Sequence, residues 1–217
     1  MASPIGYELE ILKKGFKELQ LDYTDIILDK FRVYLETLYA FKGHLHLLSH
    51  ADYNRISLKH FLPSLVALKF IADGHNACDI GAGAGFPSVP LKILKPAIEF
   101  TLFESNKKKA TFLEHLIEKL ALEKIYTINC RAEEYRDGGY EFVFIRASGK
   151  IKKLARTVNV LLMPGGRAFF YKPPNIETEL NEAKKEIKKY RFVVSVERFL
   201  TPVVHEPLAL VLLQKQG

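Results

Sequence analysis

The spacing of hydrophobic residues changes once along the chain, near residue 70. Before that point, apolar residues recur every three or four positions, as on one face of a helix. The sets with this spacing are Leu9, Leu12, Phe16 and Leu19; Ile27, Phe31, Tyr34, Leu35 and Leu38; and Phe61, Leu65 and Leu68. Pro63 falls near the first turn of the last set, where proline is tolerated. We therefore expect a helical N-terminal cap over residues 1–70.

From Ala77 onward, short apolar runs alternate with longer amphipathic segments. The pattern predicts strands at 77–80, 99–104, 125–130, 141–145 and 166–172, and helices at 87–94, 107–120, 149–162 and 177–190. Such alternation favours right-handed crossovers and a parallel sheet covered on both faces. Two last runs, 192–199 and 208–213, have no helix between them and should pair antiparallel. We expect one domain over 1–217: the cap, then a mostly parallel seven-stranded α/β core over 71–217.

The composition indicates a class of binding partner and a cellular compartment. A chain of 217 residues, 48% of them hydrophobic, can bury one substantial core. Its net charge of +7 makes nucleic acid the leading candidate partner. Cys78 and Cys130 end predicted buried strands and are interpreted as reduced core residues. The N-terminus has no apolar signal core and the run 208–213 is too short to span a bilayer, so we expect a cytoplasmic monomer with no membrane contact.

The stretch from Cys78 to Pro90, Cys-Asp-Ile-Gly-Ala-Gly-Ala-Gly-Phe-Pro-Ser-Val-Pro, is typical of a strand, a tight turn and the start of a helix. Its glycines at alternate positions are Gly81, Gly83 and Gly85. Glycine frees the backbone and opens the turn to a ligand, and the following helix N-terminus favours an anionic group. A dinucleotide-binding turn needs its third glycine where Phe86 stands, so the spacing disfavours a dehydrogenase. The Asp-Ile-Gly-x-Gly-x-Gly form resembles motif I of the S-adenosylmethionine-dependent methyltransferases.

Polar residues also follow the other predicted parallel strands, at the sheet edge where ligands bind in such folds. Glu104 ends the second strand, where an acidic side chain accepts hydrogen bonds from ribose hydroxyls. After the third strand, the N–H of Ala132 and the side chain of Glu133 are placed to meet an adenine edge. The fourth strand leads into 145–148, which includes Arg146. We expect these residues to share one site with the glycine turn.

Two groups of lysines begin helices at the same edge. Lys107 to Lys109 follow Glu104, and the second group is Lys150, Lys152 and Lys153. Cations there oppose the helix macrodipole, so a rim that keeps them is expected to hold phosphates. Lysines within 177–190 alternate with glutamates and are interpreted as a solvated face. The histidines between 44 and 50 lack a thiolate or paired carboxylate, so we expect no metal site.

Taken together, the chain resembles the GidB/RsmG family, the bacterial 16S ribosomal RNA guanine-N7 methyltransferases. The resemblance extends from Leu58 to Lys172, with the Gly-Ala-Gly-Phe-Pro turn and the later Arg146-Ala147 as its most specific parts. Pro63 stands where the family usually has aspartate, and an arginine common before the last strand is absent. The further matching pieces are Lys59 to Leu65, Glu104-Ser105 with Lys107 and Lys109, Phe112-Leu113, Arg131 to Glu134, and Gly166 to Lys172.

The resemblance implies a Rossmann-like class I methyltransferase fold, S-adenosylmethionine as cofactor, and 16S ribosomal RNA of the small subunit as substrate. The cofactor residues that it implies, with those collected above, are Asp79, Gly81, Gly83, Gly85, Phe86, Glu104, Ser105, Ala132, Glu133 and Arg146. The expected RNA-binding residues are Lys107, Lys109, Arg131, Lys150, Lys152, Lys153 and Lys172.

Guanine N7 carries a lone pair and no proton, so its methylation needs positioning and no acid–base residue. Arg146 is the candidate for that positioning, through guanine O6 or a flanking phosphate. Three alternatives stay open from the residues: a methyltransferase acting on another RNA or a small molecule, a dehydrogenase, and a non-catalytic protein that binds RNA on this scaffold.

Overall fold

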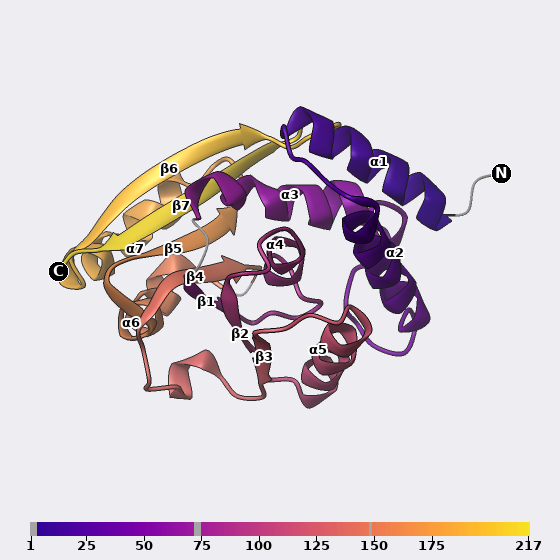
Figure 1. The fold of residues 1–217 in the computed structure, drawn as a ribbon. Helices are drawn as coiled ribbons and strands as arrows, with labels where there is room; N and C mark the ends of the chain where they lie inside the picture. The colour runs from indigo at the N-terminus through magenta and orange to yellow at the C-terminus, as the bar shows by residue number, and fades with distance from the viewer. Residues whose placement is uncertain (1–3, 72–74, 148) are drawn as a thin grey trace.

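A seven-stranded sheet forms the centre of the molecule in the computed structural model, which describes residues 4–71, 75–147 and 149–217. Its order is β3-β2-β1-β4-β5-β7-β6, and β7 alone runs against its neighbours (Figure 1). The strands are β1 (Asn76–Ile80), β2 (Glu99–Phe103), β3 (Ile125–Ile128), β4 (Tyr140–Arg146), β5 (Leu162–Lys172), β6 (Phe192–Leu200) and β7 (Pro207–Lys215). The expected mostly parallel sheet with an antiparallel C-terminal hairpin is confirmed.

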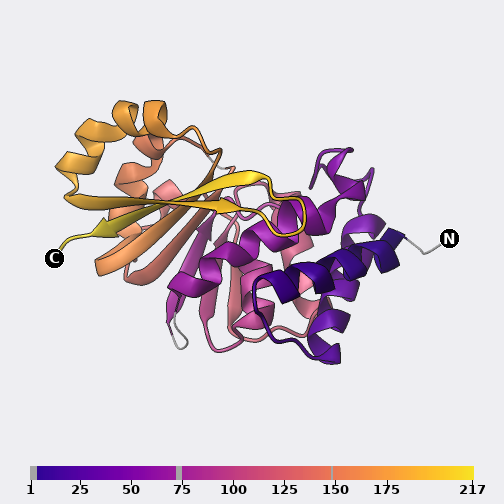
Figure 2. The same cartoon turned by 90° about the horizontal axis from the view of Figure 1, so that it is seen from above.

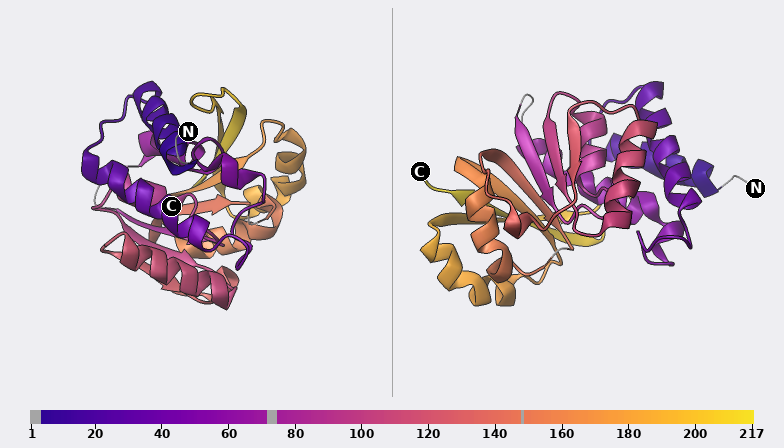
Figure 3. Two further views of the ribbon diagram at one scale, coloured as in Figure 1. Left: turned by 90° about the vertical axis from the view of Figure 1, so that its right-hand side faces the viewer. Right: turned by 90° about the horizontal axis from the view of Figure 1, so that it is seen from below.

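Helices cover both faces of this sheet (Figure 3). The four that connect its strands are α4 (Ser88–Leu94), α5 (Lys107–Lys119), α6 (Ile151–Leu161) and α7 (Glu177–Lys189). α4 and α5 share one hydrophobic core with the N-terminal cap, and α6 and α7 pack in a second core on the other face. Because parallel strands buried on both faces need apolar residues at consecutive positions, their runs stand out in the sequence.

The cap contains α1 (Pro4–Glu18) and α2 (Asp25–Ala40), as the helical spacing predicts. Its third helix is a composite of η2 (Ser57–Phe61), a π-helical turn, α3 (Leu62–Leu65) and η3 (Val66–Phe70), a 3₁₀ turn. The N–H of Leu62 bonds the carbonyl of Ser57, five residues back, and Pro63 has no N–H to continue an α-helical ladder. Between α2 and η1 (Asp52–Asn54) the chain forms turns, so the cap expected over 1–70 is not helical throughout.

Two sets of polar contacts hold the cap in place. Within it, the buried carboxylate of Glu8 accepts hydrogen bonds from the N–H groups of Ile56 (3.2 Å) and Ser57 (2.6 Å). At its outer side, Glu18 accepts a hydrogen bond from the N–H of Val203 (2.9 Å), in the loop between β6 and β7. Figure 2 shows the yellow hairpin reaching across the sheet to the indigo and purple cap. The cap therefore contacts both the sheet face and the C-terminal hairpin.

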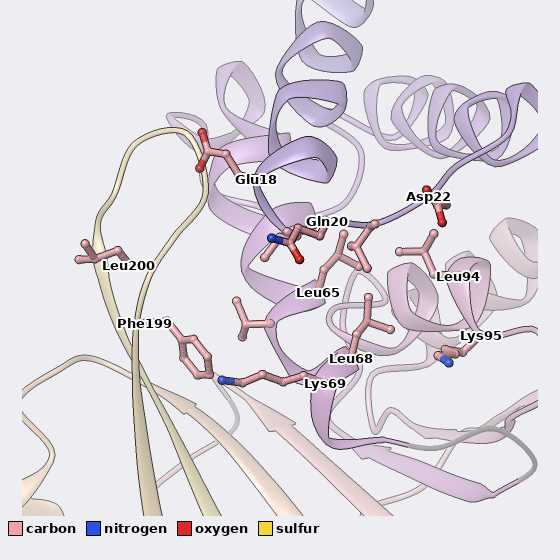
Figure 4. A pocket seen from close by; sticks show the side chains of 13 residues that line it. Glu18, Gln20, Asp22, Leu65, Leu68, Lys69, Leu94, Lys95, Phe199 and Leu200 are labelled. Atoms are coloured by element: carbon pink, nitrogen blue, oxygen red, sulfur yellow. The ribbon is translucent and has the colours of Figure 1, made fainter.

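A hollow of about 500 Å³ lies between the cap and β6 (Figure 4). Apolar side chains form its walls, including Leu65, Leu68, Leu94 and Phe199. It shares no lining residue with the hollows around the glycine turn described below. In the described ranges, no helix has the length and apolar character needed to cross a bilayer.

Replacement of Glu8 tests the internal bracing of the cap. Glu8→Ala leaves two buried N–H groups without an acceptor, and we expect the free energy of unfolding to fall by about 2–4 kcal/mol in urea denaturation. The matched control is Glu10→Ala, which removes only an exposed pair with Lys13 and should leave stability unchanged. Equal effects of the two variants would contradict a bracing role for Glu8.

Candidate cofactor and RNA site

The loop between β1 and α4 is a tight turn held against β2. Its glycines have φ angles of +72° at Gly81, +57° at Gly83 and +97° at Gly85, a region that favours glycine. The N–H groups of Gly81 and Ala82 both donate to the carbonyl of Phe103, at 2.8 and 3.1 Å. The turn therefore stands at the carboxyl edge of the sheet, beside the end of β2.

Glu104, at the end of β2, braces this turn. One carboxylate oxygen accepts the N–H of Gly83 at 2.9 Å and the other accepts the N–H of Asn106 at 2.8 Å. Its side chain is buried, yet it lines the hollow beside the turn. Since each carboxylate oxygen has a second lone pair, these bonds leave acceptor capacity toward a ligand.

Two hollows share Gly81 as a lining residue, and together they are called the cleft below. The larger, about 360 Å³, is lined by Leu47, Leu48, Gly81 to Ala84, Phe86, Glu104, Lys109, Arg146 and Ala147. The smaller, about 220 Å³, is lined by Ile80, Gly81, Phe103, Ser105, Cys130, Arg131, Ala132 and Glu133. Eight of the ten expected cofactor residues thus line the cleft, whereas Asp79 and Gly85 line neither hollow.

The cleft fits an elongated nucleoside with an amino-acid end. At Gly83 an added Cβ would meet no atom closer than 3.8 Å, so the backbone there borders open space. Glu104 lies in the larger hollow beside the turn, and Glu133 lies in the smaller one. Acidic side chains in these places suit ribose and adenine donors, so the residues present fit S-adenosylmethionine.

The cap contacts the glycine turn through Phe86 and Ala84. The ring of Tyr34 stacks on Phe86 with centroids 5.4 Å apart, and its hydroxyl donates to the carbonyl of Ala84 at 2.6 Å. His60 also stacks on Phe86, at 4.9 Å. A Cβ added at Gly85 would lie 2.6 Å from the Tyr34 hydroxyl, so this glycine is required by cap packing. Tyr34 and His60 were not among the expected site residues, because the sequence marks Tyr34 only as one apolar helical position.

Arg146 is half-buried, and its guanidinium is bonded to the cap. Its guanidinium donates to the carbonyl of His60 and the hydroxyl of Ser64, both at 3.0 Å, and to the carbonyl of Lys59. Burial lowers the pKa of Arg146. The side chain lines the cleft while it ties the end of β4 to η2 and α3, so its visible role is a brace between the sheet and the cap.

Asp79 lies beneath the turn. One oxygen of its fully buried carboxylate accepts the hydroxyl of Ser88 at 2.6 Å, and the other has no hydrogen-bond partner within the described part of the chain. Burial raises the pKa of this carboxyl from 3.8 to about 7. Burial and the nearby Arg146 lower the pKa of His60 to about 4, so this ring stays neutral at physiological pH. Asp79 lines neither hollow of the cleft, and its contact with the cofactor stays a prediction.

The expected RNA-binding residues fall into two classes. Lys107, Lys152 and Lys153 are exposed on the first turns of α5 and α6, Lys109 lines the larger hollow, and the exposed Arg131 lines the smaller. Those already paired are Lys150, which bonds Glu182 at 2.8 Å, and Lys172, which bonds Glu179 at 2.7 Å.

The contacts of Lys172 do not agree with the expectation that it binds RNA. Its side chain is 12% exposed, and its ammonium also donates to the carbonyl of Gly149 at 2.8 Å. Glu179, its partner, in addition accepts the N–H of Ile151 at the start of α6. Lys172 therefore joins β5 to α6 and α7 and does not present its charge to RNA.

The remaining expectations concern the two cysteines, a metal site and Ser148. Cys78 is buried and Cys130 is half-buried just beyond β3, and both are free thiols. Cys130 follows the strand because its N–H turns back to the carbonyl of Ile128. Within the described residues, no three His, Cys, Asp or Glu side chains are placed so that they could hold a metal ion. Ser148, at the end of the fourth expected strand region, lies outside the described residues.

Sequence comparison matches residues 27–205 to the GidB family, described as rRNA small subunit methyltransferase G. The Ribosomal RNA small subunit methyltransferase G of Lactobacillus helveticus is 34% identical over 224 residues, covering 98% of this chain and 91% of that protein. The protein of the same name from Desulforamulus reducens is 33% identical over 213 residues, with 94% and 88% covered.

Solved structures share the fold at low sequence identity. A methyltransferase from Pyrococcus furiosus has a TM-score of 0.60 at 19% identity and covers 87% of this chain and 99% of its own. The structure of P. horikoshii TYW2 in complex with MeSAdo has a TM-score of 0.61 at 13% identity, covering 81% and 67%. These likenesses confirm the expected Rossmann-like methyltransferase fold.

Substitution at Gly83 tests whether the turn holds the cofactor. Gly83→Ala should cost about 1–2 kcal/mol of stability through its positive φ, and should weaken binding of S-adenosylhomocysteine at least about tenfold because the methyl group enters the cleft. Gly139→Ala is the control, since Gly139 has φ +107° and open space around it but lies at the other end of the sheet. Calorimetric titration of both variants checks this, and unchanged affinity in Gly83→Ala would place the cofactor elsewhere.

The buried carboxyl of Asp79 should make stability depend on pH. Because its pKa is raised to about 7, the folded protein keeps a proton that the unfolded chain loses between about pH 4 and 7. The proton on folded Asp79 gives its full stabilisation below about pH 4. This stabilisation decreases as the pH rises to about 7, and above that pH the stability no longer depends on this group. Asp79→Asn lacks it, so the variant should gain stability relative to wild type across that window in urea denaturation. Parallel pH curves for the two proteins would contradict the raised pKa.

Proposed function

The chain belongs to the GidB family of rRNA small subunit methyltransferases G, and on that premise we propose that it methylates N7 of a guanine in 16S ribosomal RNA with S-adenosylmethionine as methyl donor. The observation that carries the proposal is the cleft where the glycine turn, Glu104 and Glu133 meet below exposed basic side chains. Such an enzyme acts in the cytoplasm, and we infer that it works as a monomer.

In this proposal the cofactor lies along the two joined hollows. The turn at Gly81 to Gly83 receives its amino-acid end, Glu104 accepts from its ribose hydroxyls, and the N–H of Ala132 with Glu133 reads the adenine edge. Ser105 lines the same smaller hollow. S-adenosylmethionine supplies the electrophilic methyl group when bound.

Methyl transfer to N7 needs no acid or base residue from the protein. The acceptor nitrogen already has its lone pair, so rate depends on holding the base in line with the methyl group. Leu47, Leu48 and Phe86 give the larger hollow its apolar lining, which suits the flat face of a base. Arg146 fixes the end of β4 against the cap, and so positions this wall without itself leaving its three cap acceptors.

The RNA backbone is proposed to lie along the basic rim. Lys107 and Lys108 are exposed at the start of α5, Lys109 faces the larger hollow and Arg131 borders the smaller. The first turn of α5 holds no acidic residue to compensate these cations. Phosphates held there would place a single-stranded nucleotide over the cleft.

The test is transfer of labelled methyl from S-adenosylmethionine to small-subunit RNA and particles that lack the endogenous modification, with nucleoside analysis of the product. We expect 7-methylguanosine, and Lys107→Ala should raise the KM for RNA roughly threefold to tenfold with the affinity for S-adenosylhomocysteine unchanged. Lys185→Ala, on the exposed face of α7, is the matched control and should behave as wild type. Bound cofactor with no methyl transferred to any RNA would refute the activity.

A further inference from the structure

A third hollow, of about 240 Å³, adjoins the cofactor cleft on the cap side. It is lined by Lys42, Gly43, His44, Leu45, His46, Leu48, Ser49, His50 and Tyr53. Leu48 belongs to its wall and also to the wall of the larger cleft hollow. Most of its lining comes from the turns between α2 and η1, which present three histidines and a lysine to one space.

Tyr53 lines this hollow, and its hydroxyl has no hydrogen-bond partner within the described residues. Its side chain is 3% exposed. Burial raises the pKa of Tyr53, so the hydroxyl keeps its proton and is available as a donor. A buried hydroxyl left without a partner costs about 1–3 kcal/mol, a cost that an acceptor supplied by a ligand would offset.

Lys42 supplies a fixed positive charge to the same space. Its ammonium lies 5.0 Å from the ring centre of Tyr53 and 5.9 Å from that of Tyr39. The hydroxyl of Tyr39 in turn donates to the carbonyl of Tyr53 at 2.6 Å, which holds the two rings together. Asp52 beside them has an oxygen 3.3 Å from Nε2 of His60, so its charge is directed away to that ring. A cation beside an unpartnered hydroxyl donor suits a phosphate group.

We propose that this hollow binds a backbone phosphate of the RNA strand next to the target guanine, with Lys42 and Tyr53 as its contacts. The inference rests on the proposed function, because the shared Leu48 places the phosphate one wall away from the cleft that receives the base. The exposed histidines 44, 46 and 50 leave the hollow open to solvent, as passage of a strand requires. Lys109 of α5 lines the same larger hollow as Leu48, so basic side chains lie near the base cleft both there and at Lys42.

The experiment measures equilibrium binding of unmodified 16S RNA by filter retention, with saturating S-adenosylhomocysteine, from about 50 to about 300 mM potassium chloride. Lys42→Ala should bind roughly threefold to tenfold more weakly at low salt and lower the slope of log K against log salt by about 0.7–0.9, the value of one phosphate. Tyr53→Phe removes only the hydroxyl, so it should weaken RNA binding at least about threefold with the salt slope preserved and Tm equal to or above that of wild type. Lys185→Ala is the control and should match wild type.

An unchanged salt slope in Lys42→Ala overturns the proposal, as does wild-type RNA affinity in Tyr53→Phe. Methyl transfer measured on the same samples separates this inference from the proposed function. Wild-type protein that methylates RNA while both variants bind normally overturns the phosphate site alone. Wild-type protein that binds RNA with the expected variant effects but transfers no methyl supports the phosphate site and refutes the activity. Absence of RNA binding by the wild type refutes both.

Discussion

The contact between Tyr34 of the cap and the glycine turn is the constraint on which the site depends. Stacking on Phe86 and the hydrogen bond to the carbonyl of Ala84 fix the end of the turn that contacts the cap. Glu104 fixes the other side through the N–H of Gly83. A turn with three positive φ angles is therefore held from both directions before any ligand arrives.

The polar groups around this contact form a buried hydrogen-bond network in which one acceptor has no partner among the described residues. Arg146 is satisfied by the carbonyls and hydroxyl of the cap, and the hydroxyl of Tyr171 donates to the carbonyl of Ser64 at 2.8 Å. Asp79 nearby keeps one oxygen without a partner in the described ranges. Removal of one member of such a network costs more than its single bond, because its partners are then buried without hydrogen bonds. The cap, the sheet and the turn thus behave as one unit around the cleft.

Prediction from the sequence succeeded where the fold imposes a periodic pattern. Strands β1 to β5 are buried on both faces, so each appears in the sequence as an apolar run. The helices between them cover those faces and therefore appear as amphipathic segments. It did not show the turns between α2 and η1, nor the π and 3₁₀ turns of the third helix, where the missing N–H of Pro63 affects the backbone.

By itself the sequence determined the order of the elements, the glycine turn, and the edge of the sheet at which Glu104, Ala132 and Glu133 would meet. The rule that ligands bind at the carboxyl ends of parallel strands is topological, so it needs no side-chain coordinates. Only the tertiary structure decided which charges are available. Lys172 and Arg146 look like any other basic rim residues in the sequence, yet Glu179 holds the first and the cap carbonyls hold the second. Pairing across elements distant in sequence depends on side-chain packing, which no local pattern encodes.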